Sequence, residues 1–90
     1  MMVKDKKCFF CDATEGLDEH HCMHGTANRK LAEKYDLKVW LCRYHHTIGI
    51  RSVHKCKQTD AILQKYAQKY FEENIGSHEL WMQEFKKNYL

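Results

Sequence analysis

Two short cysteine and histidine motifs place the strongest constraint on this chain. Cys8 and Cys11 form a Cys-x2-Cys pair, and Cys42 and His45 form a Cys-x2-His pair. Together they make a Cys3His set of the kind that binds tetrahedral Zn2+. A chain of 90 residues buries little apolar area beyond what offsets its lost conformational entropy, so a structural metal would stabilise it considerably. We therefore predict a structural zinc site at these four residues, coupled to folding.

Other uses of the cysteines are less well supported by the sequence. The chain has five cysteines, an odd number, and its first residues contain no apolar signal segment, so we expect reduced thiols and a cytoplasmic protein. A helix needs about 20 apolar residues to cross a bilayer, and no apolar run in this sequence approaches that length. Cys22 and Cys56 are rival zinc ligands, but neither has a partner two residues away. The alternative for Cys8 and Cys11 is a pair of inert, buried thiols.

The hydrophobic pattern predicts a small α+β domain. It indicates a strand, a helix, a second strand and a helix start, followed by a basic segment and two helices. We expect the strands at 17–23 and 37–41, with the first helix starting at 26 between them. The helix start is expected at 43–48, the basic segment at 50–57 and the last two helices within 58–90. Thr26, Thr59 and Ser77 are the expected helix caps. The prediction is a single domain, residues 1–90, with a zinc-bound core at 8–57 and C-terminal helices at 58–90 packed on it.

Histidines are the second distinctive feature. The chain has seven, and four of them form the adjacent pairs His20-His21 and His45-His46. Neighbouring residues on a strand face opposite sides, so His20 and His21 are expected to have different roles. With His45 assigned to zinc, the fold would bring His20, His21 and His46 together. An ion held by two imidazoles, beside a third that accepts a proton from water, could hydrolyse a phosphodiester. The alternatives are a surface pair without a role, or a second structural zinc.

The motifs also resemble those of a known family. Cys8-x2-Cys11, Glu19-His20-His21, Asn28 and Leu41-Cys42-x2-His45-His46 are similar to the HNH endonucleases. Together with residues 25–30 and 87–90, they resemble small phage and prophage HNH-like nucleases associated with recombination. The resemblance implies a ββα-metal fold and a metal-dependent DNA endonuclease or nickase.

The resemblance also implies roles for individual residues. His20 and His46 would bind the catalytic metal, His21 would activate water, and Asn28 would orient the catalytic histidine. The family often has a fourth cysteine where this chain has His45, and a further histidine where it has Ile50. His54 is therefore the candidate for an additional metal ligand.

The expected partners follow from charge and from the resemblance. The net charge of +3 is compatible with a polyanion without requiring one. The residues expected to contact DNA phosphates are Arg29, Lys30, Arg51, Lys55 and Lys57. We expect Zn2+ in the structural site and Mg2+, Mn2+, Ni2+ or Zn2+ in the catalytic site. Other phage recombination or replication proteins are candidate partners, in the host cell cytoplasm. The alternative is an inactive, zinc-stabilised DNA- or protein-binding module.

Overall fold

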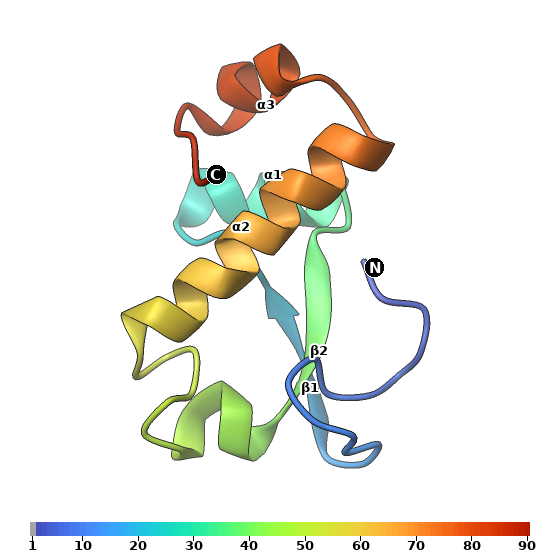
Figure 1. Ribbon diagram of the computed structural model, residues 1–90, viewed down its shortest axis with the longest axis vertical. Coiled ribbons are helices and arrows are strands. Elements are labelled where there is room, and N and C mark those ends of the chain that lie inside the picture. Colours follow the sequence, from blue (N-terminus) through green and yellow to red (C-terminus); the bar gives the residue numbers. More distant parts are fainter. Residues whose placement is uncertain (1) are drawn as a thin grey trace.

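A computed structural model describes residues 2–90 as a β-hairpin module covered by helices (Figure 1). The elements are β1 (Leu17–His21), α1 (Thr26–Lys34), β2 (Lys38–Cys42), the π-helical turn η1 (Tyr44–Ile48), α2 (Lys57–Asn74) and α3 (His78–Phe85). The predicted α+β class, with a helix between the two strands and a C-terminal helical pair, is confirmed. Within residues 2–90, every helix is too short or too polar to serve as a membrane span.

His20 and His21, which are adjacent on β1, lie on opposite faces of the two-stranded sheet. β1 and β2 are antiparallel, with His20 opposite Val39 and His21 opposite Lys38. Val39 is fully buried and His20 is only 4% exposed, so this face of the hairpin points into the molecule. His21 lies on the other face with Glu19. The predicted placement of the two histidines on opposite faces of the strand is therefore confirmed, and their different roles stay a prediction.

The N-cap of helix α1 is Gly25 and not the predicted Thr26. Thr26 is the first helical residue, and Gly25 occupies the N-cap position with φ of 91° and without a side-chain hydrogen bond. The prediction of Thr26 as a cap is wrong, because the left-handed conformation that glycine permits turns the chain into the helix at Gly25. Ala32 is fully buried, and Leu31 and Tyr35 pack at the edge of the core.

The segment after η1 folds back over it. Gly49 follows the turn, and the backbone N–H groups of Val53 and His54 donate to the carbonyl groups of His45 and His46, at 2.9 and 3.3 Å. These hydrogen bonds bring His54 beside His46. The sequence of residues 50–57 did not indicate this position, because the segment has no hydrophobic repeat.

The C-terminal helices pack onto the hairpin module and on each other. Helix α2 crosses in front of α1, and α3 lies above both at the top of the view (Figure 1). Trp81 of α3 is fully buried between Phe71 and Phe85, with ring centroids 5.3 and 4.0 Å away. These residues belong to the same cluster of buried side chains as Val39 of the hairpin.

One of the two predicted C-terminal caps is present. The Ser77 hydroxyl accepts a hydrogen bond from the Leu80 N–H at 3.1 Å, so the predicted cap of α3 is confirmed. Thr59 does not cap α2, because that helix starts at Lys57 after Cys56. The carbonyl of Cys56 already accepts the helical hydrogen bond from Asp60, at 3.1 Å.

Candidate metal centres

Three thiols and one imidazole meet at the base of the hairpin. His45 Nδ1 lies 3.6 Å from Cys8 Sγ and 3.2 Å from Cys42 Sγ, and Cys11 Sγ lies 3.8 Å from Cys42 Sγ. A tetrahedral zinc with ligand bonds of about 2.0 to 2.3 Å separates its ligands by roughly 3.3 to 3.8 Å. The structure thus brings together the four residues chosen from their spacing, in an arrangement that can hold a structural Zn2+.

Backbone hydrogen bonds shape this Cys3His cluster. The Cys8 N–H donates to the Ala13 carbonyl at 2.9 Å, which closes the turn, and the Phe9 N–H donates to Trp40 of β2 at 2.8 Å. Burial acts to raise the pKa of Cys8, but hydrogen bonds from the backbone of Cys42 at the end of β2, and from Phe10 and Cys11 in the turn, outweigh it, so the pKa is lowered. A lowered pKa favours the thiolate, which is the form that binds metal.

The two rival cysteines lie outside the cluster. Cys22 is fully buried, and that burial raises the pKa of its thiol. Cys56 occupies the N-cap position of α2. Neither contributes a ligand atom to the Cys3His cluster, as the absence of a partner two residues away predicts.

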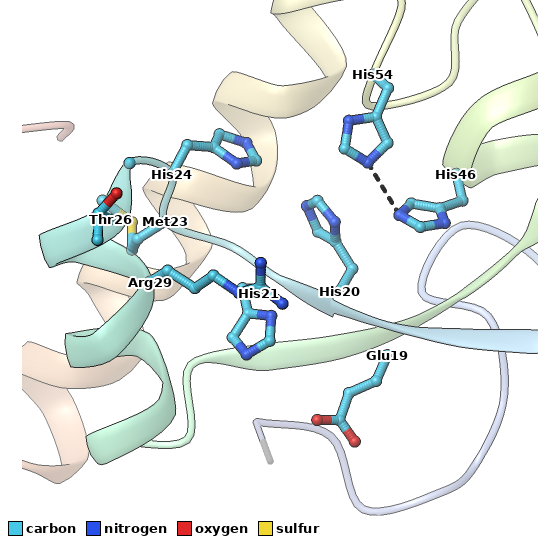
Figure 2. A pocket seen from close by; sticks show the side chains of 10 residues that line it. Glu19, His20, His21, Met23, His24, Thr26, Arg29, His46 and His54 are labelled. Atoms are coloured by element: carbon cyan, nitrogen blue, oxygen red, sulfur yellow. Dashed lines mark hydrogen bonds between the residues drawn. The ribbon is translucent and has the colours of Figure 1, made fainter.

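Three histidines from separate segments form a second cluster, here called the histidine pocket. His20 comes from β1, His46 from η1 and His54 from the loop after it, and their rings point toward one another (Figure 2). His46 Nε2 lies 3.0 Å from His54 Nε2, and the ring centroid of His20 lies 5.3 and 5.5 Å from theirs. The cavity they line has a volume of about 420 Å³.

A carboxylate fixes how His46 faces the pocket. His46 Nδ1 lies 3.0 Å from Asp18 Oδ2. An ionised carboxylate only accepts hydrogen bonds, so Nδ1 carries the proton and Nε2 is left as the ligand atom. Metal-binding histidines are commonly oriented by such a carboxylate. The two facing Nε2 atoms of His46 and His54 are close enough to bind one ion between them.

His20 has the environment of a metal ligand. Its Nε2 atom is buried and has no hydrogen-bond partner among residues 2–90. Burial, and after it the neighbouring His46, His24 and His54, lowers the pKa of His20 to about 3. The ring is therefore neutral at pH 7. A buried, neutral, unpartnered imidazole nitrogen costs free energy unless something binds it, and a divalent ion would satisfy it.

His21 is held by a different set of charged groups. His21 Nε2 lies 2.5 Å from Glu33 Oε2, and the other Glu33 oxygen accepts from Lys38 Nζ at 3.1 Å. Lys38 also donates to Glu19 at 2.7 Å. The hydrogen bond from His21, followed by that from Lys38, lowers the pKa of Glu33. With Nε2–H donated to this carboxylate, Nδ1 of His21 is the nitrogen that can accept a proton.

The predicted DNA-contacting residues lie at different distances from the pocket. Arg29 lines it, and its side chain extends from α1 toward His21 (Figure 2). Lys30 borders a neighbouring hollow that His21 and Arg29 also line. Lys55 and Lys57 border a hollow that shares His54 with the pocket. Arg51 is exposed in the loop after η1.

Asn28 is on α1 but is not among the residues that line the histidine pocket, and its assigned role stays a prediction. Four other residues at the site were not found from the sequence, namely Asp18, His24, Glu33 and Asp60. Only Asp18 could have been found from the sequence. It is two residues before His20, so strand alternation places both on the same face.

Comparison with known proteins identifies no relative: no family model, no curated protein and no solved structure matches the chain.

Proposed function

We propose that this protein is a metal-dependent DNA endonuclease or nickase of the HNH type. One observation carries the proposal: the buried, unpartnered Nε2 of His20 faces His46 and His54 in an open pocket that His21 also lines. The separate Cys3His cluster would hold the structural zinc, which leaves the histidine pocket for a catalytic ion.

The residues of the pocket divide into ligands and a base. His20, His46 and His54 would hold one divalent ion, which when bound supplies a Lewis acid for the departing 3′ oxygen. His21 lies on the opposite face of the same strand, and its Nδ1 would accept the proton of the attacking water. Glu33 stabilises the imidazolium that forms. This arrangement would assign metal binding and proton transfer to different side chains, and together these two functions can hydrolyse a phosphodiester.

Basic side chains around the pocket support a nucleic acid as the substrate. Residues 43–59, which provide His46 and His54, contain no aspartate or glutamate but include Arg51, Lys55 and Lys57. Together with Arg29 at the rim, they would contact phosphates on both sides of the scissile bond. We further propose, from the motif resemblance, that the protein is phage-encoded and acts in the host cytoplasm with recombination or replication proteins.

A plasmid assay tests this function. The purified protein, with structural zinc loaded, is incubated with supercoiled plasmid and Mg2+, Mn2+, Ni2+ or Zn2+ in turn, and nicked and linear products are quantified. We expect cleavage by wild type, and loss of about 10² to 10⁴ in rate for His21→Ala, because the variant lacks the general base. His78→Ala is the control, since His78 is an exposed histidine on α3.

The same assay can reject the proposal. Equal products from wild type and His21→Ala would show that His21 is not the base. No cleavage under any metal, with DNA still bound, would favour a zinc-stabilised binding module that lacks catalysis.

A further inference from the structure

A second group of metal donors lies on the α2 side of the histidine pocket. His24 Nε2 lies 2.7 Å from Asp60 Oδ1, and the rings of His20 and His24 have centroids 5.6 Å apart. The ligand atoms of His20, His24 and Asp60 all fall within 4.8 Å of one another. His20 therefore stands between two donor groups, one with His46 and His54 and one with His24 and Asp60.

We propose that His20, His24 and Asp60 form a second position for a divalent ion, alternative to the position between His20, His46 and His54. The two positions differ in chemistry. Three imidazoles suit Zn2+ and Ni2+, whereas two imidazoles with one carboxylate and open coordination positions also suit Mn2+ and Fe2+. The same pocket would thus accept harder ions by shifting them toward Asp60.

The two positions compete because they share one ligand. The buried Nε2 of His20 has no hydrogen-bond partner among residues 2–90, and one nitrogen lone pair binds one ion. An ion on the His46 side leaves His24 paired with Asp60, as the structure has it. An ion on the His24 side replaces that pairing with metal bonds. The pocket therefore holds one ion at a time.

The second position would connect parts of the chain that the first does not. His24 follows β1, and Asp60 lies in the first turn of α2. An ion bound there joins the hairpin module directly to the C-terminal helical pair. An ion in the first position joins β1 only to η1 and the loop that follows it.

An ordinary histidine and carboxylate pair on the surface provides a comparison. The side chains of His24 and Asp60 are 43% and 20% exposed, and those of His78 and Glu72, 3.1 Å apart, are 47% and 20% exposed. Within residues 2–90, the His78 and Glu72 pair belongs to no group of three metal donors. What distinguishes His24 and Asp60 is their proximity to the buried His20.

Manganese binding to the full-length protein tests the proposal. The structural zinc is loaded first, and Mn2+ is then titrated while the signal of free Mn2+ is followed by electron paramagnetic resonance. His46→Ala removes a ligand of the first position only, and we expect it to bind one Mn2+ per chain. Adding Asp60→Asn to this variant should weaken binding at least tenfold. Adding Glu72→Gln instead is the matched control and should leave the affinity unchanged.

Two results would overturn the proposal. One is equal Mn2+ affinity in His46→Ala with and without Asp60→Asn. The other is no Mn2+ binding at all by a His46→Ala protein that keeps its structural zinc and its helical circular dichroism. If His46→Ala loses the structural zinc, His54→Ala replaces it in the same comparison, because His54 is remote in sequence from His45. Cleavage is not measured, so the outcome is independent of the proposed nuclease activity.

Discussion

Asp18 Oδ2 lies 3.0 Å from Nδ1 of His46, and this contact decides which nitrogen of His46 faces the histidine pocket. Asp18 comes from β1 and His46 from η1, where His46 directly follows His45 of the Cys3His cluster. The structural metal site and the orientation of a ligand in the second site are thus linked through the same short segment of backbone.

Asp18→Asn should weaken metal binding in the histidine pocket by about 10- to 100-fold, as loss of an orienting carboxylate generally does. Asparagine can accept the same hydrogen bond but without charge, so the fold should be preserved. Titration with Co2+ after zinc loading measures the affinity, and the exposed Asp5→Asn is the control. An unchanged affinity for Asp18→Asn would mean that the carboxylate has no role in metal binding.

Cys42→Ser should lower the melting temperature sharply or leave the chain unfolded, because zinc binding contributes to folding in a module of this size. Cys56→Ser is the matched control, since Cys56 lies outside the cluster. Thermal unfolding by circular dichroism and zinc content by mass spectrometry provide the measurements. Full zinc content and an unchanged melting temperature in Cys42→Ser would place the zinc elsewhere.

Acid should destabilise the protein partly through His20. Its pKa falls from 6.5 to about 3 in the folded chain, so below pH 6.5 the unfolded state binds a proton that the folded state does not. This contribution to stability is complete above pH 6.5 and is lost as the pH falls from 6.5 toward 3, with a slope of up to about 1.4 kcal/mol per pH unit.

The variant that checks this contribution is His20→Gln, without added divalent metal. Urea unfolding between pH 6.5 and 4.5 should give a free energy of unfolding that falls less steeply than in wild type. The difference between the two proteins removes the effect of acid on the Cys3His cluster, which both proteins contain. If the free energies of unfolding of wild type and His20→Gln fall equally with pH, His20 is not held in a buried, neutral state.

DNA binding should depend strongly on salt if the basic residues contact phosphates. Each phosphate contact contributes a slope of about −0.9 in log K against log salt, so Arg29→Ala should make the slope shallower by about that amount. Fluorescence anisotropy at several salt concentrations measures it. Lys69→Ala, an exposed lysine further along α2 than Asp60, serves as the control. A slope unaffected by Arg29→Ala argues against a phosphate contact at this residue.

Local sequence patterns predicted the Cys3His group and the orientation of the histidine pair. The spacing of Cys8 and Cys11 constrains two sulfur atoms regardless of the rest of the fold. Strand alternation then places His20 and His21 on opposite faces, which the register with Val39 and Lys38 bears out. These inferences needed only neighbouring residues.

Contacts between distant residues could not be predicted in the same way. His54 reaches His46 because backbone hydrogen bonds fold the loop over a π-helical turn, and neither feature has a hydrophobic period. Asp60 reaches His24 through the packing of α2. Periodicity can also mislead. Ile62 lies four residues before Tyr66 and eight before Tyr70, a helical apolar spacing, but it is 52% exposed, because the face of α2 that meets the core carries Leu63, Ala67 and Phe71.

Glu33→Gln separates the role of His21 as a base from any role in binding. The substitution keeps a hydrogen-bond acceptor beside His21 Nε2 but removes the negative charge that stabilises the imidazolium. In the proposed nuclease, the turnover rate should therefore fall by about tenfold or more, but by less than in His21→Ala, for which a general base accounts for about 10² to 10⁴. KM and the affinity for metal should not change, because Glu33 is absent from the cluster of His20, His46 and His54. Steady-state cleavage kinetics measure both constants, with the exposed Glu73→Gln as the control. A Glu33→Gln protein with the wild-type turnover rate would mean that the contact with His21 only holds α1 against the hairpin.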